Sequence, residues 1–206
     1  MPRDETVDTR TLLPDWYAAE THLAHLLPYV SLVDDHTIRT RVNEIFQCIR
    51  LGGVNSYTTD DAYLDKVTTL FARLIAQLGP GFSYYVHKVS KAITPDLAPV
   101  QGDGFAAAVD SVWRERLGQA GLRDKTLTLT LIHRPPPKSF LCFVNRSDPE
   151  RFKEETKKRM RRLNEAVGVF TSGLAELKPR RLSAASGELI GFLGALNTGQ
   201  AVPLYP

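Results

Sequence analysis

The chain has 206 residues, of which 43% are hydrophobic and 24% charged, and its formal net charge is +3 at pH 7. It is long enough to bury the core of one domain or of two small packed lobes. The charge falls well short of the concentrated basic footprint that argues for nucleic-acid binding. No apolar run approaches the roughly 20 residues that span a bilayer.

Cysteine usage and the amino terminus favour a cytoplasmic protein. Cys48 and Cys142 are the two cysteines, too few for a disulfide framework and without a second thiol at metal-ligand spacing. Residues 1–10 mix basic and acidic side chains and lack the apolar stretch of a signal peptide. Any membrane association is therefore expected to depend on a partner or a surface patch.

The first quarter of the chain predicts a helix followed by a small antiparallel sheet. Residues 1–11 are expected to be flexible, and a helix within Leu12–Leu27 is ended by Pro28. A hairpin turn is expected near Val42 and Asn43. The predicted strands are Val30–Val33, Thr37–Arg41 and Glu44–Leu51.

The middle of the chain alternates between amphipathic helices and strands. Thr58 is expected to cap a helix over Thr59–Leu78, in which apolar residues recur at helical spacing. After a loop from Ile93 to Gly104, a second amphipathic helix is expected over Phe105–Leu117. Alternating apolar and polar residues predict two strands, Phe82–Val89 and Lys125–His133.

Pro135–Pro137 form the clearest internal boundary. Beyond them come a short apolar run, Phe140–Val144, a long helix opened by Asp148 and Pro149, and a short helix over Gly187–Leu196. We therefore predict an α+β fold, a mainly antiparallel sheet with amphipathic helices packed on it. An α+β lobe over residues 12–134 would be followed by a mainly helical second part over residues 135–206.

The sequence contains no pattern typical of an enzyme. No Gly-Lys dipeptide occurs, so the phosphate-binding loop of ATPases is absent from these residues. His22 and His25 are spaced i, i+3 on a predicted helix, but no third metal ligand accompanies them. We predict no catalytic, cofactor-binding or metal-binding residue here, and a function that depends on the surfaces of the chain.

The dense basic stretch of the chain lies on the long predicted helix. Glu150, Glu154 and Glu155 interleave with it, and Glu155 has favourable i, i+4 spacing to Arg159. A solvated helix face is the leading interpretation, and binding to an acidic partner surface is the second. The alternative function is a nucleic-acid-binding adaptor that uses the basic helix over residues 150–163. The basic residues are Lys153, Lys157, Lys158, Arg159, Arg161 and Arg162.

The apolar run Phe140–Val144 also has two interpretations. It is either an ordinary core strand or an apolar arm that the stiff prolines present to another protein. The second interpretation combines the arm with the basic helix into one docking surface. The predicted partner-binding residues are then Phe140, Leu141, Phe143, Lys157, Lys158, Arg161 and Arg162.

Three stretches carry a family resemblance in the same order. They are Leu27–Tyr29 with the Thr40–Gly52 hairpin, the strand Leu127–Pro135, and Arg181–Leu182 followed by Gly187–Pro206 with its Phe192-Leu193 helix, Gly199 turn and Val202-Pro203-Leu204 exit strand. Together they resemble the amino-terminal domain of the CagE/TrbE/VirB ATPases of bacterial type IV secretion systems. The Val42-Asn43 turn departs from the Asp-Gly type of turn that is usual in the family.

The resemblance implies a non-catalytic docking domain that couples a cytoplasmic motor to the inner-membrane part of a secretion machine. The implied partners are inner-membrane subunits and the ATPase's own motor domain, in a homo-hexamer when full length, without direct nucleic-acid binding. The implied location is cytoplasmic and peripheral to the bacterial inner membrane. ATP and Mg²⁺ are expected in the RecA-like motor domain that follows in family members, and no catalytic residue carries over to this chain.

Overall fold

The computed structural model describes residues 27–54, 59–93, 98, 100, 102, 104–136, 149–199 and 202–205. The predicted helix within Leu12–Leu27 and the apolar run Phe140–Val144 lie outside the described residues, apart from Leu27. The described elements are β1 (Tyr29–Leu32), β2 (Ile38–Thr40), β3 (Ile45–Leu51), α3 (Asp61–Gln77), β4 (Phe82–Ala92), α4 (Phe105–Gln119), β5 (Arg123–His133), α5 (Pro149–Gly173), the 3-10 helix η3 (Ala175–Leu177), β6 (Arg180–Arg181) and α6 (Glu188–Thr198).

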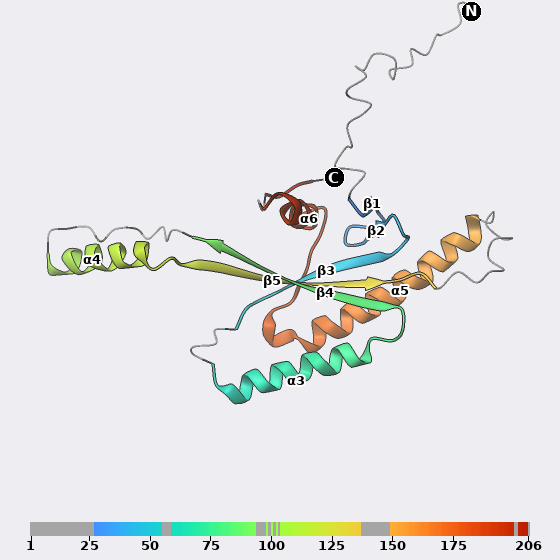
Figure 1. Ribbon diagram of the computed structural model, residues 1–206, viewed down its shortest axis with the longest axis horizontal. Coiled ribbons are helices and arrows are strands. Elements are labelled where there is room, and N and C mark those ends of the chain that lie inside the picture. The colour runs from blue at the N-terminus through green and yellow to red at the C-terminus, as the bar shows by residue number, and fades with distance from the viewer. Residues whose placement is uncertain are drawn as a thin grey trace, which may run out of the picture.

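A six-stranded sheet forms the centre of the fold, with the strand order β1-β2-β3-β5-β4. The short strand β6 pairs with β3, beyond the end of the β2 pairing. Every pairing is antiparallel, and helices lie above and below the sheet in Figure 1. The prediction of an α+β fold with a mainly antiparallel sheet is therefore confirmed.

The predicted hairpin is formed by β2 and β3. Its turn contains Asn43 with a φ of 60°, a left-handed conformation that asparagine tolerates better than most residues. The backbone N–H of Asn43 donates to the carbonyl oxygen of Thr40 at 2.9 Å. The Val42-Asn43 turn thus closes the hairpin without the glycine that is usual in the family.

Helices α3 and α5 cover one face of the sheet. The apolar stripe along α5 and just after its end is fully buried there, with Leu163, Val167, Phe170 and Leu174 each at most 3% exposed. Leu74 of α3 packs so closely on α5 that a Cβ added to Gly173 would lie 3.0 Å from its methyl groups. This layer is the larger of two core clusters.

Helix α6 covers the opposite face. Its buried residues Leu189, Phe192 and Leu193 pack with Phe46 and Ile132 of the sheet. Residues 202–205 run back beside this helix, where the N–H of Leu204 donates to the carbonyl oxygen of Gly187 at 3.0 Å. They form no regular strand in the structure, unlike the exit strand that the resemblance implied.

Three predicted boundaries differ from the structure. Helix α3 begins at Asp61, with Asp60 and not Thr58 in the N-cap position. Strands β4 and β5 are each longer than predicted, because their outer ends pair with each other, as Ala92 does with Arg123. The additional residues form backbone hydrogen bonds with the neighbouring strand, and the alternation of apolar and polar residues does not predict such bonds.

Helix α4 differs more strongly from the expectation that amphipathic helices pack on the sheet. Figure 1 shows it at the far end of the extended β4 and β5 strands, away from the other helices. None of its residues is buried.

The predicted domain boundary at the prolines is a separate question. Helices α5 and α6 follow Pro135–Pro137, and they share their core clusters with strands that precede these prolines. The division at residue 134 stays a prediction.

Candidate docking surface

The basic stretch of α5 is divided between the surface and the interior. Lys157, Lys158, Arg161 and Arg162, the predicted partner-binding residues of this helix, are all exposed. Arg159 is 4% exposed and points inward. The four exposed cations therefore lie together in the middle of the helix, with Glu154 and Glu155 before them and Glu165 after them.

Arg159 instead connects α5 to the β2–β3 hairpin turn and to β5. Its Nη2 donates to the carbonyl oxygens of Asn43 at 2.6 Å and His133 at 3.1 Å. Burial lowers the pKa of its guanidinium, and the nearby carboxylates of Glu155 and Glu44 oppose that shift. The expected i, i+4 ion pair between Glu155 and Arg159 does not form, because the guanidinium reaches backbone acceptors at the hairpin turn.

The other predicted docking residues are Phe140, Leu141 and Phe143, which lie outside the described residues. Whether this apolar run is a core strand or an exposed arm therefore stays a prediction. The described chain nevertheless carries other apolar surfaces that sequence periodicity did not identify as exposed.

The largest of these surfaces is on α4. Phe105, Val109, Val112 and Trp113 are 87%, 51%, 52% and 53% exposed. The opposite side of the helix holds its connecting loop, since Asp110 accepts from Arg114 at 2.6 Å and from the N–H of Val100 at 3.2 Å. The name α4 apolar face is used below for Phe105, Val109, Val112 and Trp113.

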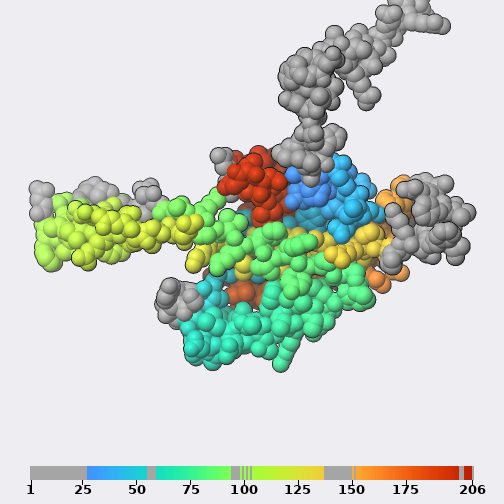
Figure 2. Space-filling model, viewed as in Figure 1, coloured from blue at the N-terminus to red at the C-terminus, as the bar shows by residue number. Residues whose placement is uncertain are grey.

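A second apolar surface follows the outer strand of the sheet. Tyr84, Tyr85 and Val86 of β4 are 42%, 56% and 48% exposed. Tyr84 pairs with Leu131 and Tyr85 with Thr130, so the two tyrosines point to opposite faces, as the strand pattern predicted. Figure 2 shows β4, in green, at the surface between α6 in red and α3 in teal.

A groove of about 300 Å³ lies between α6 and the sheet, and residues from β1 across to β4 line it, including Tyr29, Glu44 and Arg134. His87 stands at its wall, where its ring meets that of Phe192 edge-on with centroids 5.3 Å apart. Burial lowers the pKa of His87, so the imidazole is mainly neutral at pH 7. Six of the lining residues are Tyr85, His87, Thr130, Ile132, Phe192 and Leu196.

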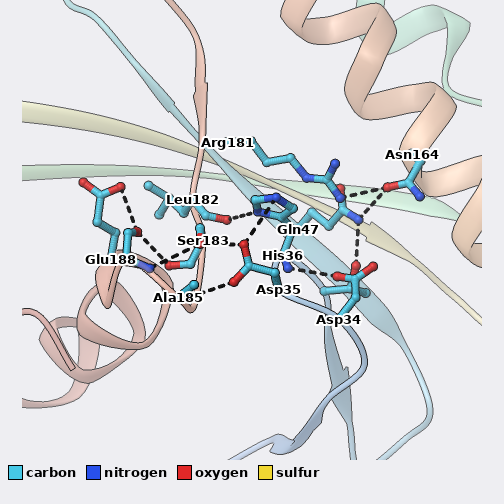
Figure 3. A network of polar contacts seen from close by, with 12 residues as sticks. Asp34, Asp35, His36, Gln47, Asn164, Arg181, Leu182, Ser183, Ala185 and Glu188 are labelled. Atoms are coloured by element: carbon cyan, nitrogen blue, oxygen red, sulfur yellow. Dashed lines mark hydrogen bonds and ion pairs between the residues drawn. The ribbon is translucent and has the colours of Figure 1, made fainter. Parts of the chain in front are cut away.

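A polar network on the other side of α6 is structural in character (Figure 3). Asp35, in the β1–β2 loop, accepts from the hydroxyl of Ser183 at 2.6 Å and from the N–H of Ala185 at 2.7 Å. These hydrogen bonds lower the pKa of Asp35. His36 Nδ1 lies 2.8 Å from the carbonyl oxygen of Leu182, and therefore donates. The network holds the segment before α6, which contains Leu182, Ser183 and Ala185, against the β1–β2 loop.

The network continues into the sheet through Gln47 of β3. Its Nε2 donates to Thr37 at 2.7 Å and to Asn164 of α5 at 2.9 Å, and Arg181 of β6 donates to the same Asn164 oxygen at 2.8 Å. These contacts join β3, β6 and α5. Sequence patterns missed this network because its members are far apart in the chain and follow no local spacing.

One match to a known family bears on what kind of protein these surfaces belong to. Within the described residues, no helix is both long enough and apolar enough to cross a bilayer. No curated protein matches the chain. The family model of the type IV secretion system ATPase VirB4/TrbE, N-terminal domain, matches residues 36–139.

The family match runs from the β1–β2 loop through β5 and its proline-rich end, and so includes the sheet centre and the α4 projection. It covers the Thr40–Gly52 hairpin and the strand Leu127–Pro135 of the three stretches that carried the resemblance, and leaves Leu27–Tyr29 and Arg181–Pro206 outside. The chain therefore belongs to the VirB4/TrbE family of type IV secretion system ATPases and contains the N-terminal domain of that family.

Proposed function

We propose that this chain is a non-catalytic docking domain that couples the cytoplasmic motor of a type IV secretion system to its inner-membrane subunits. One observation supports this most directly. Half of the exposed large apolar side chains, nine of eighteen in the described residues, fall between Tyr84 and Trp113. They form two surfaces, one along β4 and one on the projecting α4. Exposed apolar patches are typical of surfaces that another protein covers.

The proposal assigns the chemistry of ATP to a different part of the full-length protein. ATP and Mg²⁺ would bind a RecA-like motor domain, and hexamer formation would involve that domain. The location follows from the partners: a cytoplasmic domain held at the inner membrane by the subunits it binds.

The alternative, a nucleic-acid-binding adaptor that uses α5, has less support. Nucleic-acid binding by phosphate neutralisation needs several cations on one accessible face. Arg159 is buried, and Glu154, Glu155 and Glu165 stand among the remaining exposed cations. The exposed side of α5 therefore has mixed charge.

Co-purification with the inner-membrane subunits of the same secretion system tests docking. The double variant Val109→Ser with Trp113→Ser removes much of the α4 apolar face and should weaken co-purification without lowering the melting temperature. The matched control changes two exposed apolar residues outside that region, Val42→Ser with Val169→Ser. Complete absence of binding by the unchanged chain would contradict the docking function.

Calorimetric titration with Mg-ATP tests the non-catalytic part of the proposal. We expect no saturable heat, because the sequence has no phosphate-binding loop. A micromolar site, abolished by one substitution within residues 1–206, would contradict it.

A further inference from the structure

The free edge of β4 has the properties of a site for strand addition. Strand β4 is last in the strand order, and within the described residues no strand pairs with its outer edge. An edge strand presents a row of unpaired N–H and C=O groups, which form a template for another strand. At 11 residues, β4 and β5 are the longest strands described.

Natural edge strands are usually protected against such pairing by charges, prolines, bulges or shortness. The first half of β4, Phe82–His87, has none of these features. It contains no proline and no Lys, Arg, Asp or Glu, and its register with β5 continues without a shift from Phe82 to Ala92. The name β4 edge is used below for the outer edge of Phe82–His87.

The groove under α6 lies directly beside this edge. Tyr85 and His87 point from β4 into the groove wall, and Phe192 and Leu196 line it from α6. A second cavity, also about 300 Å³, shares Phe192 with the first and is lined by Val89 and by charged residues that include Arg50, Lys91, Asp124 and Glu188. Alternate residues of an added strand would project on the α6 side of the sheet, toward these two cavities.

We propose that the β4 edge binds an extended peptide segment of the docking partner as an additional strand, with alternate aliphatic side chains entering the groove under α6. This inference rests on the proposed docking function and specifies its contact. The uncharged edge and the apolar side chains of Tyr85, Phe192 and Leu196 select a stretch rich in β-branched or aromatic residues, and the charged lining residues Glu44 and Arg134 pair with each other. Lys88 and Lys91, at the outer end of the strand, favour an acidic residue at the corresponding end of the peptide.

Amide hydrogen exchange tests the contact at the backbone. The probes are overlapping 12-residue peptides that cover the cytoplasmic segments of the inner-membrane subunits. A peptide that binds should slow exchange over Phe82–His87 more than over α4 or α5. Protection confined to α4 would overturn strand addition while leaving the docking function in place.

Proline variants distinguish binding through backbone hydrogen bonds from binding through side chains. Successive residues of an antiparallel strand direct their N–H groups alternately toward the neighbour and toward the free edge. Of Tyr85→Pro and Val86→Pro, one therefore removes a bond to β5 and the other removes an amide of the free edge. The variant that removes the amide of the free edge should be the better folded of the two. It should bind the peptide at least about tenfold more weakly than the variant with alanine at the same position.

The groove has its own test. Leu196→Trp fills it from the α6 side and should weaken peptide binding at least about tenfold, whereas Val169→Trp on α5 should leave binding unchanged. Equal affinities for both variants would overturn the role of the groove.

Two further outcomes would overturn the proposal. If the full inner-membrane subunits bind but none of the peptides does, the contact is not an extended segment, although docking stands. If the β4 amides that point to the free edge are already protected in the isolated protein, the edge has another occupant. Sedimentation velocity then distinguishes a second copy, seen as a dimer, from a segment of the same chain, seen as a monomer.

Discussion

Helices α4 and α5 have the same apolar spacing and opposite surroundings. Phe105, Val109 and Val112 follow one another at intervals of four and three residues, as Leu163, Val167 and Phe170 do. The stripe on α5 is buried against the sheet, and the stripe on α4 is more than half exposed at the end of two long strands. Amphipathic periodicity therefore predicts a helix, but not whether its apolar face meets the protein's own core or the surface of a partner.

The most direct test of this difference between α4 and α5 introduces an aspartate into the apolar stripe of each helix. Val167→Asp would bury a carboxylate in the core and should cost about 4 kcal/mol of unfolding free energy. Val109→Asp, at the equivalent helical position on α4, should stay within about 0.5 kcal/mol because its side chain is half exposed. Chemical denaturation measures both. Similar losses would mean that the α4 stripe is also covered in the isolated chain.

The second test concerns the inward arginine of α5. Arg159→Met removes the donor that two carbonyl groups share and should cost about 2 kcal/mol. Arg161→Met, two residues away on the exposed side, should change stability by less than about 0.5 kcal/mol. If the two variants melt alike, the contacts to the hairpin turn and to β5 contribute little to stability.

The third test measures how the unfolding free energy depends on pH, through the partly buried histidine His133. His133 has a lowered pKa because of burial, with Arg159 as the next contribution. The unfolded chain therefore takes up a proton first as pH falls. Stability from neutral His133 is present above the unfolded pKa of about 6.5 and is lost as pH falls below it.

The unfolding free energy should accordingly decrease between about pH 7.5 and about pH 5.5. His133→Asn should reduce this slope, and adding His87→Asn should reduce it further, since burial also lowers the pKa of His87. Urea titrations at several pH values measure the slope. An unchanged slope in the double variant would show that other groups cause it.

The smallest effect on stability is expected for the exposed cations of α5. Reversing Lys157, Lys158 and Arg161 to Glu should leave the melting temperature nearly unchanged, because these side chains lie at the surface. If α5 faces an acidic partner, association should slow at low salt and recover at high salt, where exposed charges are screened. Stopped-flow binding to the inner-membrane subunits measures the rate. Salt-independent rates would exclude electrostatic steering by this helix.

The same contrast shows how much of the candidate site was predictable. The exposure of Lys157, Lys158, Arg161 and Arg162 agrees with their place on the polar side of a helix. Arg159 could not be separated from them, because its acceptors are backbone groups of distant elements. The β4 edge also escaped prediction, since alternation along a strand does not tell a central strand from an edge strand.

Local sequence patterns predicted the longer helices and strands of the described residues, but not β6 or η3. Period-two and period-3.6 patterns place the strands and helices, asparagine permits the hairpin turn, and proline opens α5. Tertiary structure decided which of these elements share a core. Strand order puts β4 at the edge, and the long β4–β5 pairing carries α4 away from the sheet. Both outcomes depend on contacts between residues far apart in the chain, which local periodicity does not encode.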